Sequence, residues 1–346
     1  MLKKIMKAAL AASLVFGFSS MAMADVKVNG DVATYYGQYN TGEEGYAAHF
    51  ANASEGHIKV TGKQGPISMF LEVESRDDRY GTGNNLNNLQ LAATWASGPL
   101  SVKMGTVTTG LACEFALSSG LKTTTTLGLG AAGGCAGYYE QDGIQATYMI
   151  PAIKGAAMLT IMPSTGGQIM ALGATGMIAD MVGFRFNQSN NTTDDFTDDT
   201  DDAVTDSEMH VGVKVPLGSA KMLLSLEMNT TLDKEATNPV TQAATDKDLK
   251  RSDMAVQFTG KDMGPGTLIF TYATKNMTFD GDAVVAISDM DLVYRFDLAK
   301  GVGFDVFYLS QASLYDSDVA DFIEAATGNS PDITKTFIGG GFFASF

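Results

Sequence analysis

The chain ends on an uncharged, aromatic segment, Phe337–Phe346, with the sequence FIGGGFFASF. A solvated terminal tail should be polar, so this ending indicates a strand that is held in place. Successive side chains of a strand point to opposite faces. One face therefore carries Ile338, Gly340, Phe342, Ala344 and Phe346, and the other carries Gly339, Gly341, Phe343 and Ser345. The first face suits an apolar medium, whereas the second is small and rich in glycine.

Alternation of apolar and polar residues with a period of two dominates the rest of the chain, and this pattern predicts strands. The clearest segments are 26–36, 67–74, 89–95, 209–215, 222–228, 254–258, 290–297 and 304–308. As helices, these segments would present charged and apolar residues on every side, so the helical alternative is weak.

Two kinds of connection alternate between the expected strands. The short ones are rich in Gly and Pro and predict tight turns: Gly62–Pro66, Ser97–Pro99, Pro151–Gly155, Ala179–Met181, Pro216–Ser219, Asp262–Gly266 and Lys300–Gly303. The long ones are polar: Asn40–Tyr46, Asp77–Asn85, the stretch after Thr106, Pro163–Gln168, Asn190–Ser207, Thr231–Asp248, Asn276–Ala283 and Leu314–Ile333. This division predicts about sixteen antiparallel strands with both ends of the barrel domain on the short-turn side. The pattern of residues 156–187 is less clear, so the predicted number of strands could differ from sixteen by two.

Short turns on one side, long loops on the other and an even strand number are typical of outer-membrane β-barrels. We therefore predict an all-β fold, a transmembrane antiparallel barrel. Closure is required in lipid, where an open edge would leave backbone groups unpaired. The last strand should then pair with the first, Val26–Tyr39, and place Phe346 at the periplasmic interface. A secreted sandwich or solenoid is the alternative, but it explains neither the loop asymmetry nor the terminal Phe. Candidates for the interfacial aromatic girdles are Tyr35, Tyr36, Tyr39, Tyr272, Tyr294 and Tyr308, with Tyr35 expected to face inward.

The N-terminus has the features of a secretory signal peptide. A basic start is followed by the apolar run Ala8–Phe18 and by Ala22-Met23-Ala24, which predicts cleavage after Ala24 and a barrel domain of residues 25–346. The apolar run is shorter than the ~20 residues that a spanning helix needs. Without residues 1–24 the chain has 20 basic and 39 acidic residues, a net charge of −19. Such a charge argues against nucleic-acid binding.

The longest departure from the strand pattern is the segment 106–140, which follows the fifth expected strand. A barrel of about sixteen strands leaves an aqueous channel, and a long loop of small residues could fold inward and narrow it. Cys113 and Cys135 flank 21 residues of this loop. Export to an oxidising compartment favours a disulfide between them, worth about 3 kcal/mol by loop entropy. A pair of free thiols is the alternative.

The run GPLSVKMGTVTTGLACEFALSSG, followed by YYEQDGIQATYMIP, resembles the general bacterial porin family. The segment GHIKVTGKQG resembles that family's second strand and first periplasmic turn. Glu114-Phe115 fits the motif that these porins carry on their third loop, with Cys113 in place of the family's Pro. The resemblance implies a homotrimeric, water-filled, passive channel in the outer membrane, in contact with lipid and open to small hydrophilic solutes and ions. It implies no cofactor.

The resemblance also implies a constriction where acids of the loop face basic residues of the wall. The expected acids are Glu114, Glu140 and Asp142, beside Phe115. His57 stands where the family often has Arg, and Lys59 and Lys103 are the expected wall cations together with Lys27. Few opposing arginines and a strongly acidic chain favour cations.

The segment Asp194–Glu208 holds seven Asp and one Glu. It lacks the spacing of an EF-hand, so no dedicated metal site is predicted, and weak divalent binding at Asp198, Asp199, Asp201 and Asp202 is left open against a solvated loop. No nucleophile, metal or phosphate motif points to catalysis, and the register places His57 and His210 inward. A barrel that serves as a surface adhesin or anchor is the alternative to a channel.

Overall fold

The computed structural model describes residues 25–42, 47–76, 85–108, 140–164, 167–179, 181–193, 204–234, 247–317, 319–321, 324 and 332–346. Within these residues, no helix is long and apolar enough to cross a membrane. Strands account for nearly all of the regular structure, as the period-two pattern predicts.

Sixteen strands follow one another along the chain. They are β1 (Asp25–Asn40), β2 (His49–Gln64), β3 (Ile67–Arg76), β4 (Asn85–Ser97), β5 (Leu100–Thr108), β6 (Glu140–Ile150), β7 (Gly155–Ser164), β8 (Gly167–Ile178), β9 (Val182–Thr193), β10 (Val204–Leu217), β11 (Ser219–Asp233), β12 (Leu249–Met263), β13 (Gly266–Phe279), β14 (Asp282–Ala299), β15 (Val302–Tyr315) and β16 (Ile333–Ser345). The predicted strand number is confirmed, including the region 156–187, where β7, β8 and β9 each run through apolar or small residues.

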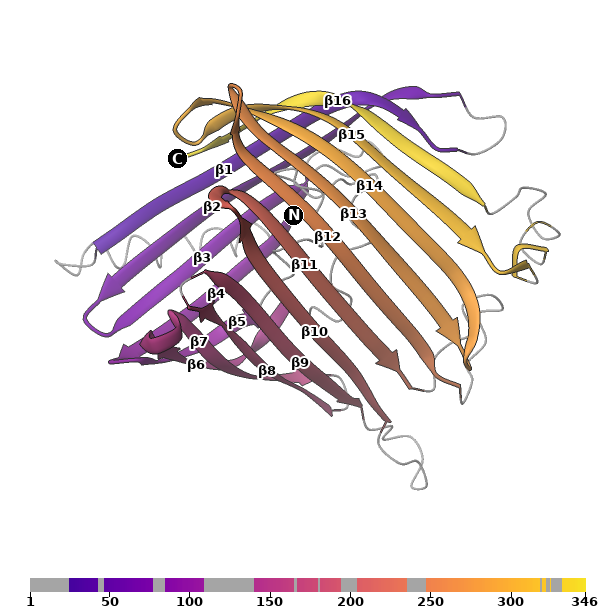
Figure 1. The fold of residues 1–346 in the computed structure, drawn as a ribbon. Helices are drawn as coiled ribbons and strands as arrows, with labels where there is room; N and C mark the ends of the chain where they lie inside the picture. The colour runs from indigo at the N-terminus through magenta and orange to yellow at the C-terminus, as the bar shows by residue number, and fades with distance from the viewer. Residues whose placement is uncertain are drawn as a thin grey trace.

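Every strand pairs antiparallel with its neighbours in sequence, and β16 pairs with β1 to close the barrel. Figure 1 shows this seam, where the yellow C-terminal strand lies against the indigo N-terminal strand. The register runs from Asp31 opposite Ser345 to Asn40 opposite Thr336. Beyond it, the backbone N–H of Phe346 donates to the carbonyl of Gly30. The predicted pairing of the last strand with the first is confirmed.

The glycines of β16 allow close packing at the seam. Gly341 lies opposite Tyr35 of β1 on one side and opposite Asp305 of β15 on the other. A Cβ on Gly341 would lie 2.6 Å from the Cα of Tyr35 and 2.7 Å from its ring. The absence of a side chain at Gly341 therefore lets the Tyr35 side chain lie over β16. A larger residue at position 341 would occupy the same space.

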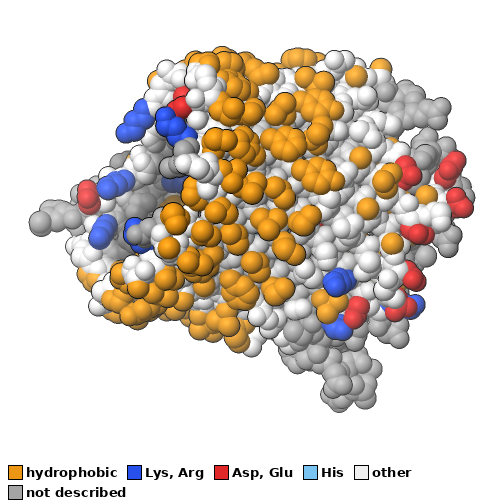
Figure 2. Space-filling view, viewed as in Figure 1, with side chains coloured by type: hydrophobic (Ala, Val, Ile, Leu, Met, Phe, Trp, Pro, Cys, Tyr) orange, Lys and Arg blue, Asp and Glu red, His pale blue; other side chains and the backbone are white. Residues whose placement is uncertain are grey.

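The outer face is apolar, and Figure 2 shows a broad belt of hydrophobic side chains across the strands. Near the C-terminus the apolar residues Ile338, Phe342 and Phe346 are exposed, while Phe337, which precedes them in β16, is fully buried. The predicted alternation of the last strand is confirmed. In the same view, the charged side chains gather at the two ends of the belt, mainly Lys and Arg at one end and Asp and Glu at the other.

All seven predicted tight turns connect strands at one end of the barrel. Two of the eight predicted long loops are wrong, because the strands continue into them. β13 and β14 are joined by a tight turn at Asp280 and Gly281, which both have positive φ, 54° and 89°. Asp-Gly readily supplies this conformation in hairpins. Likewise, β7 extends to Ser164 and β8 begins at Gly167.

The tyrosines lie on the inner or the outer face according to their positions in the strands, and they do not all lie in interfacial girdles. Tyr36 and Tyr272 are exposed on the outer face, and Tyr35 is fully buried inside, as predicted. The girdle assignment of Tyr39 is wrong, since it shares the inner face with Tyr35 and contacts the ring of Phe337. The aromatic chain that does lie near the short turns comprises Tyr294, Phe296, Phe304 and Phe342.

Candidate functional site: the inner wall of the barrel

The inner face of the barrel carries the charged residues that the chain buries. Among the described Asp, Glu, Lys and Arg residues, those that are buried are all acidic: Glu72, Glu208, Glu227, Asp253, Asp289, Asp291 and Asp305. Each lies on the opposite face of its strand from an exposed apolar residue, as Asp291 does beside Met290 and Leu292. The period-two pattern thus places apolar side chains on the outer face of the barrel, where they suit contact with lipid, and charged side chains on the inner face.

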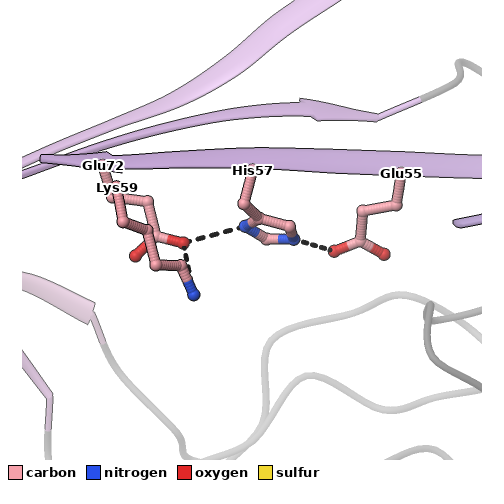
Figure 3. A network of polar contacts seen from close by, with 4 residues as sticks. All are labelled: Glu55, His57, Lys59 and Glu72. Carbon is pink, nitrogen blue, oxygen red and sulfur yellow. Dashed lines mark hydrogen bonds and ion pairs between the residues drawn. The ribbon is translucent and has the colours of Figure 1, made fainter. Parts of the chain in front are cut away.

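On one wall, β2 and β3 hold a compact polar network around His57 (Figure 3). The ring Nδ1 lies 2.8 Å from Oε1 of Glu72, and Nε2 lies 2.9 Å from Oε1 of Glu55. Lys59 Nζ approaches the same Glu72 oxygen at 3.1 Å. Carboxylates only accept hydrogen bonds, so a doubly protonated imidazole would donate to both glutamates. The two glutamate side chains are about nine-tenths buried, which strengthens these interactions relative to a water-exposed pair.

Two further acids face this network across the strands. Asp31 of β1 is the register partner of His57 on one side, and Glu74 of β3 is its partner on the other. Ligand atoms of Glu55, His57 and Glu74 all lie within 4.8 Å of one another. Among the side chains described for this part of the wall, one imidazole and one ammonium group therefore lie beside four carboxylates.

Beyond the seam between β1 and β16, Arg295 of β14 holds a second part of the wall together. Its Nε donates to Oδ1 of Asp305 at 2.9 Å, and its Nη2 donates to Oδ2 at 2.8 Å. The guanidinium also lies over the ring of Phe343, 4.8 Å from the centroid. Tyr35 donates its hydroxyl to Oδ2 of Asp305 at 2.9 Å, so β1, β14 and β15 meet at one buried carboxylate. A bidentate arginine pair of this kind fixes both orientation and register.

Further along the wall, charged pairs continue towards the long-loop end. Nε2 of the buried His210 lies 3.2 Å from Oε1 of Glu227, and Arg251 Nη2 lies 2.7 Å from Oδ2 of Asp253. The predicted inward placement of both His57 and His210 is confirmed. The wall as a whole can attract and orient charged solutes, and among the described residues it does not bring a serine or cysteine nucleophile to either histidine.

Two hollows lie on the inner wall near opposite ends of the strands. The larger, of about 640 Å³, is lined by Asp31, Lys261, Arg295 and Phe343 among others near the short turns. The smaller, of about 250 Å³, is lined by Asp206, Glu208, Asp233 and Arg251 near the long loops. Both mix acidic and basic groups, which suits water and ions rather than an apolar ligand.

The predicted constriction residues fall into three groups. His57 and Lys59 lie together in the network of Figure 3, and Lys103 faces inward with its Nζ 5.8 Å from the centroid of Phe70. Asp142 shares the face of β6 that carries the exposed Ile144, so it points outward and its predicted position in the lumen is wrong. Glu114, Phe115, Cys113, Cys135, the Glu140 side chain and Asp198, Asp199, Asp201 and Asp202 lie outside the described residues.

The sequence analysis did not single out most of the wall acids. Glu72, Glu74 and Asp305 alternate with apolar residues, and Glu55 shares the face of His57, so the strand register alone would have placed these acids inside. Their pairing with particular cations depends on the register between neighbouring strands. Asp305 and Arg295, for example, are brought opposite each other by the β14–β15 register.

The sequence matches no protein-family model and no curated protein. Solved structures do match across the barrel. An anion-selective porin from Comamonas acidovorans is 13% identical, with a TM-score of 0.64 over 94% of this chain and 100% of that one. The fold is that of the bacterial porins. The outer-membrane channel DcaP of Acinetobacter baumannii is also 13% identical, with a TM-score of 0.62 over 94% of this chain and 98% of that one. OmpT of Vibrio cholerae, an outer-membrane protein described in a trimer form, is 10% identical, with a TM-score of 0.56 over 93% and 99%.

At these identities the likeness shows the porin fold alone. The fold predicted from strand alternation and loop asymmetry is confirmed in its strand number, its antiparallel order and its closure. The inward folding of the loop 109–139 lies outside the described residues.

Proposed function

We propose that this chain is a member of the general bacterial porin family and forms a passive, water-filled channel in the outer membrane of a Gram-negative bacterium. The observation that carries the proposal is the division of one closed barrel into an apolar outer belt and a charged inner wall. A closed barrel of sixteen strands leaves an aqueous passage, and a charged lining lowers the cost of moving ions and hydrophilic solutes through it.

The channel performs no chemistry and needs no cofactor. Selectivity arises from the width of the passage and from the charge along its wall. The porin-fold neighbours named above support a channel more than an adhesin or a structural anchor, because two of them are described as a porin and a channel.

The charge balance supports a preference for cations. The buried charged residues of the described wall are acidic, and the whole chain carries a net charge of −16. Fields from such a lining concentrate counter-ions in the passage and repel anions. The Comamonas porin has the same fold and is described as anion-selective, so the fold by itself does not imply a preference for cations, and the proposal depends on the lining residues of this chain.

The assembly and maturation of the chain complete the proposal. We propose cleavage after Ala24, a homotrimer in the membrane and a Cys113–Cys135 disulfide that holds the third long loop in one shape. On that loop, Glu114 and Phe115 would lie at the narrowest point, opposite His57, Lys59 and Lys103. Alkylation of the cysteines before and after reduction tests the disulfide, because a closed pair is labelled only after reduction.

Liposome swelling tests the channel directly. Vesicles that contain the folded protein are diluted into iso-osmotic solutions of neutral sugars of increasing size, with protein-free vesicles as the control. We expect swelling whose rate falls as the sugar grows. Folded barrels that give no swelling with any sugar would exclude a diffusion channel and favour the adhesin or anchor.

A further inference from the structure

The network around His57 has the composition of a transition-metal site. Glu55, His57 and Glu74 each offer one ligand atom, and these atoms all lie within 4.8 Å of one another. Imidazole nitrogen and carboxylate oxygen are both ligands of Zn²⁺ and related ions, at about 2.0–2.2 Å. Two ligands bound to one such ion are at most about 4.2 Å apart, so only small side-chain rotations would bring the three onto one ion.

Glu72 supplies the support that a metal-bound histidine usually has. Its Oε1 accepts from Nδ1 of His57 at 2.8 Å, and its side chain is largely buried. A carboxylate in this position fixes the tautomer that keeps the proton on Nδ1, and it leaves Nε2 as the electron-pair donor. Nε2 is the nitrogen that faces Glu55, at 2.9 Å. The ring is thus already oriented with its donor nitrogen towards the other proposed ligand groups.

The contact between Nε2 and Glu55 requires a positive charge between them. An unprotonated Nε2 and a carboxylate oxygen would repel each other at 2.9 Å, so the contact requires either a proton on Nε2 or a cation that binds both atoms. The surrounding charge also favours a cation, since the carboxylates of Asp31, Glu55, Glu72 and Glu74 lie on the strands around the ring. A divalent ion would replace the proton on Nε2 and neutralise more of this charge.

We propose that His57 Nε2, Glu55 and Glu74 form a binding site for a divalent transition-metal ion of the Zn²⁺ class on the inner wall of the barrel, with Glu72 as the residue that positions His57. The open side of the site faces the lumen, where water would complete the coordination. The site is independent of the proposed channel activity, because a barrel that does not conduct can still bind the ion.

Isothermal titration calorimetry with ZnCl₂ tests the proposal on the full-length, detergent-folded protein. We expect one saturable class of sites with one ion per chain. In His57→Gln the affinity of this class should fall at least tenfold, and in Glu74→Gln it should also fall. Glu72→Gln, which keeps the three ligands but loses the support of Nδ1, should weaken binding about 10–100-fold. Weak binding at exposed carboxylates should persist in every variant.

His49→Gln is the matched control, since His49 begins the same strand, is exposed and contacts the ring of Tyr39. It should bind Zn²⁺ as the wild type does. His210→Gln provides a second control, because His210 is an inward histidine with only Glu227 against Nε2. The heat-modifiable gel mobility of each variant confirms that it is folded, and Glu74→Gln keeps the test decisive if His57→Gln does not fold. Absence of saturable binding in the wild type, or equal binding in His57→Gln and His49→Gln, would overturn the proposal.

Discussion

Tyr35 and Asp305 are joined by a hydrogen bond of 2.9 Å across the closing strand, although 270 residues separate them in the chain. Gly341 of β16 lies between them in the register, and its missing side chain leaves the path clear. The same carboxylate accepts two hydrogen bonds from the guanidinium of Arg295. The glycine-rich end of the chain therefore serves closure, since it lets the first and fifteenth strands interact over the sixteenth.

Gly341→Ala should destabilise the barrel by about 1–3 kcal/mol. The new Cβ would lie 2.6 Å from the Cα of Tyr35 and would also meet the backbone carbonyl of Thr34, so the seam would have to shift. Urea unfolding in detergent measures the change. Gly62→Ala is the matched control, because a Cβ there has no neighbour within 4 Å. Equal effects of the two substitutions would show that the close approach at Gly341 does not matter.

Asp305→Asn should cost about 3 kcal/mol of stability, because it leaves the guanidinium of Arg295 without its charge partner inside the barrel. Tyr35→Phe removes only one donor to the same carboxylate and should cost about 1 kcal/mol. Asp262→Asn is the control. Asp262 pairs with Lys221 at 2.7 Å, but both side chains are about two-thirds exposed, so no measurable change is expected. Similar losses for Asp305→Asn and Asp262→Asn would contradict a structural role for the buried pair.

Leu292→Lys should destabilise the folded barrel in lipid by about 2–4 kcal/mol, because Leu292 lies in the outer belt near the middle of β14. Leu314→Lys places the same charge on the outer face near the long-loop end of β15 and should cost about 0–1 kcal/mol. Unfolding titrations in phospholipid vesicles measure both. A larger loss at Leu314 than at Leu292 would mean that the membrane does not contact the belt as described.

Glu114→Gln should lower the preference for cations without changing stability, if Glu114 lies at the narrowest point of the passage. The removed charge would no longer concentrate cations there. The reversal potential in a salt gradient measures the change. Lys221→Gln, near the short-turn end and largely exposed, gives a control for the effect of charge far from the constriction. An unchanged reversal potential in Glu114→Gln would contradict the proposed place of the loop.

Much of the fold could be predicted from the sequence, because strand alternation, tight turns and an apolar terminal strand are local signals. Sequence reasoning failed where the same local pattern is compatible with two different structures, such as a long loop or a tight turn. The polar residues of Asn276–Ala283 suggested a loop, whereas Asp280-Gly281 form a tight turn and the strands on both sides continue. Tyr39 suggested an interface anchor, but its odd position on β1 puts it inside with Tyr35.

The candidate site was less predictable. His57 and Lys59 were found because they lie in a segment that resembles the porins, while their partner Glu72 was missed because only the β2–β3 register brings it to them. Asp142 was expected in the lumen from the resemblance to the porins, whereas its alternation with the exposed Ile144 places it on the outer face. Pairings such as Arg295 with Asp305 depend on the strand register, which the sequence pattern alone did not define.

Single-channel conductance in a planar bilayer, with a salt gradient across it, tests the central claim most directly. We predict stepwise openings in groups of three and a reversal potential of the sign expected for cation preference. Openings with anion preference would keep the channel and contradict the proposed role of the wall acids. Correctly folded protein that inserts but carries no current would contradict the porin function itself.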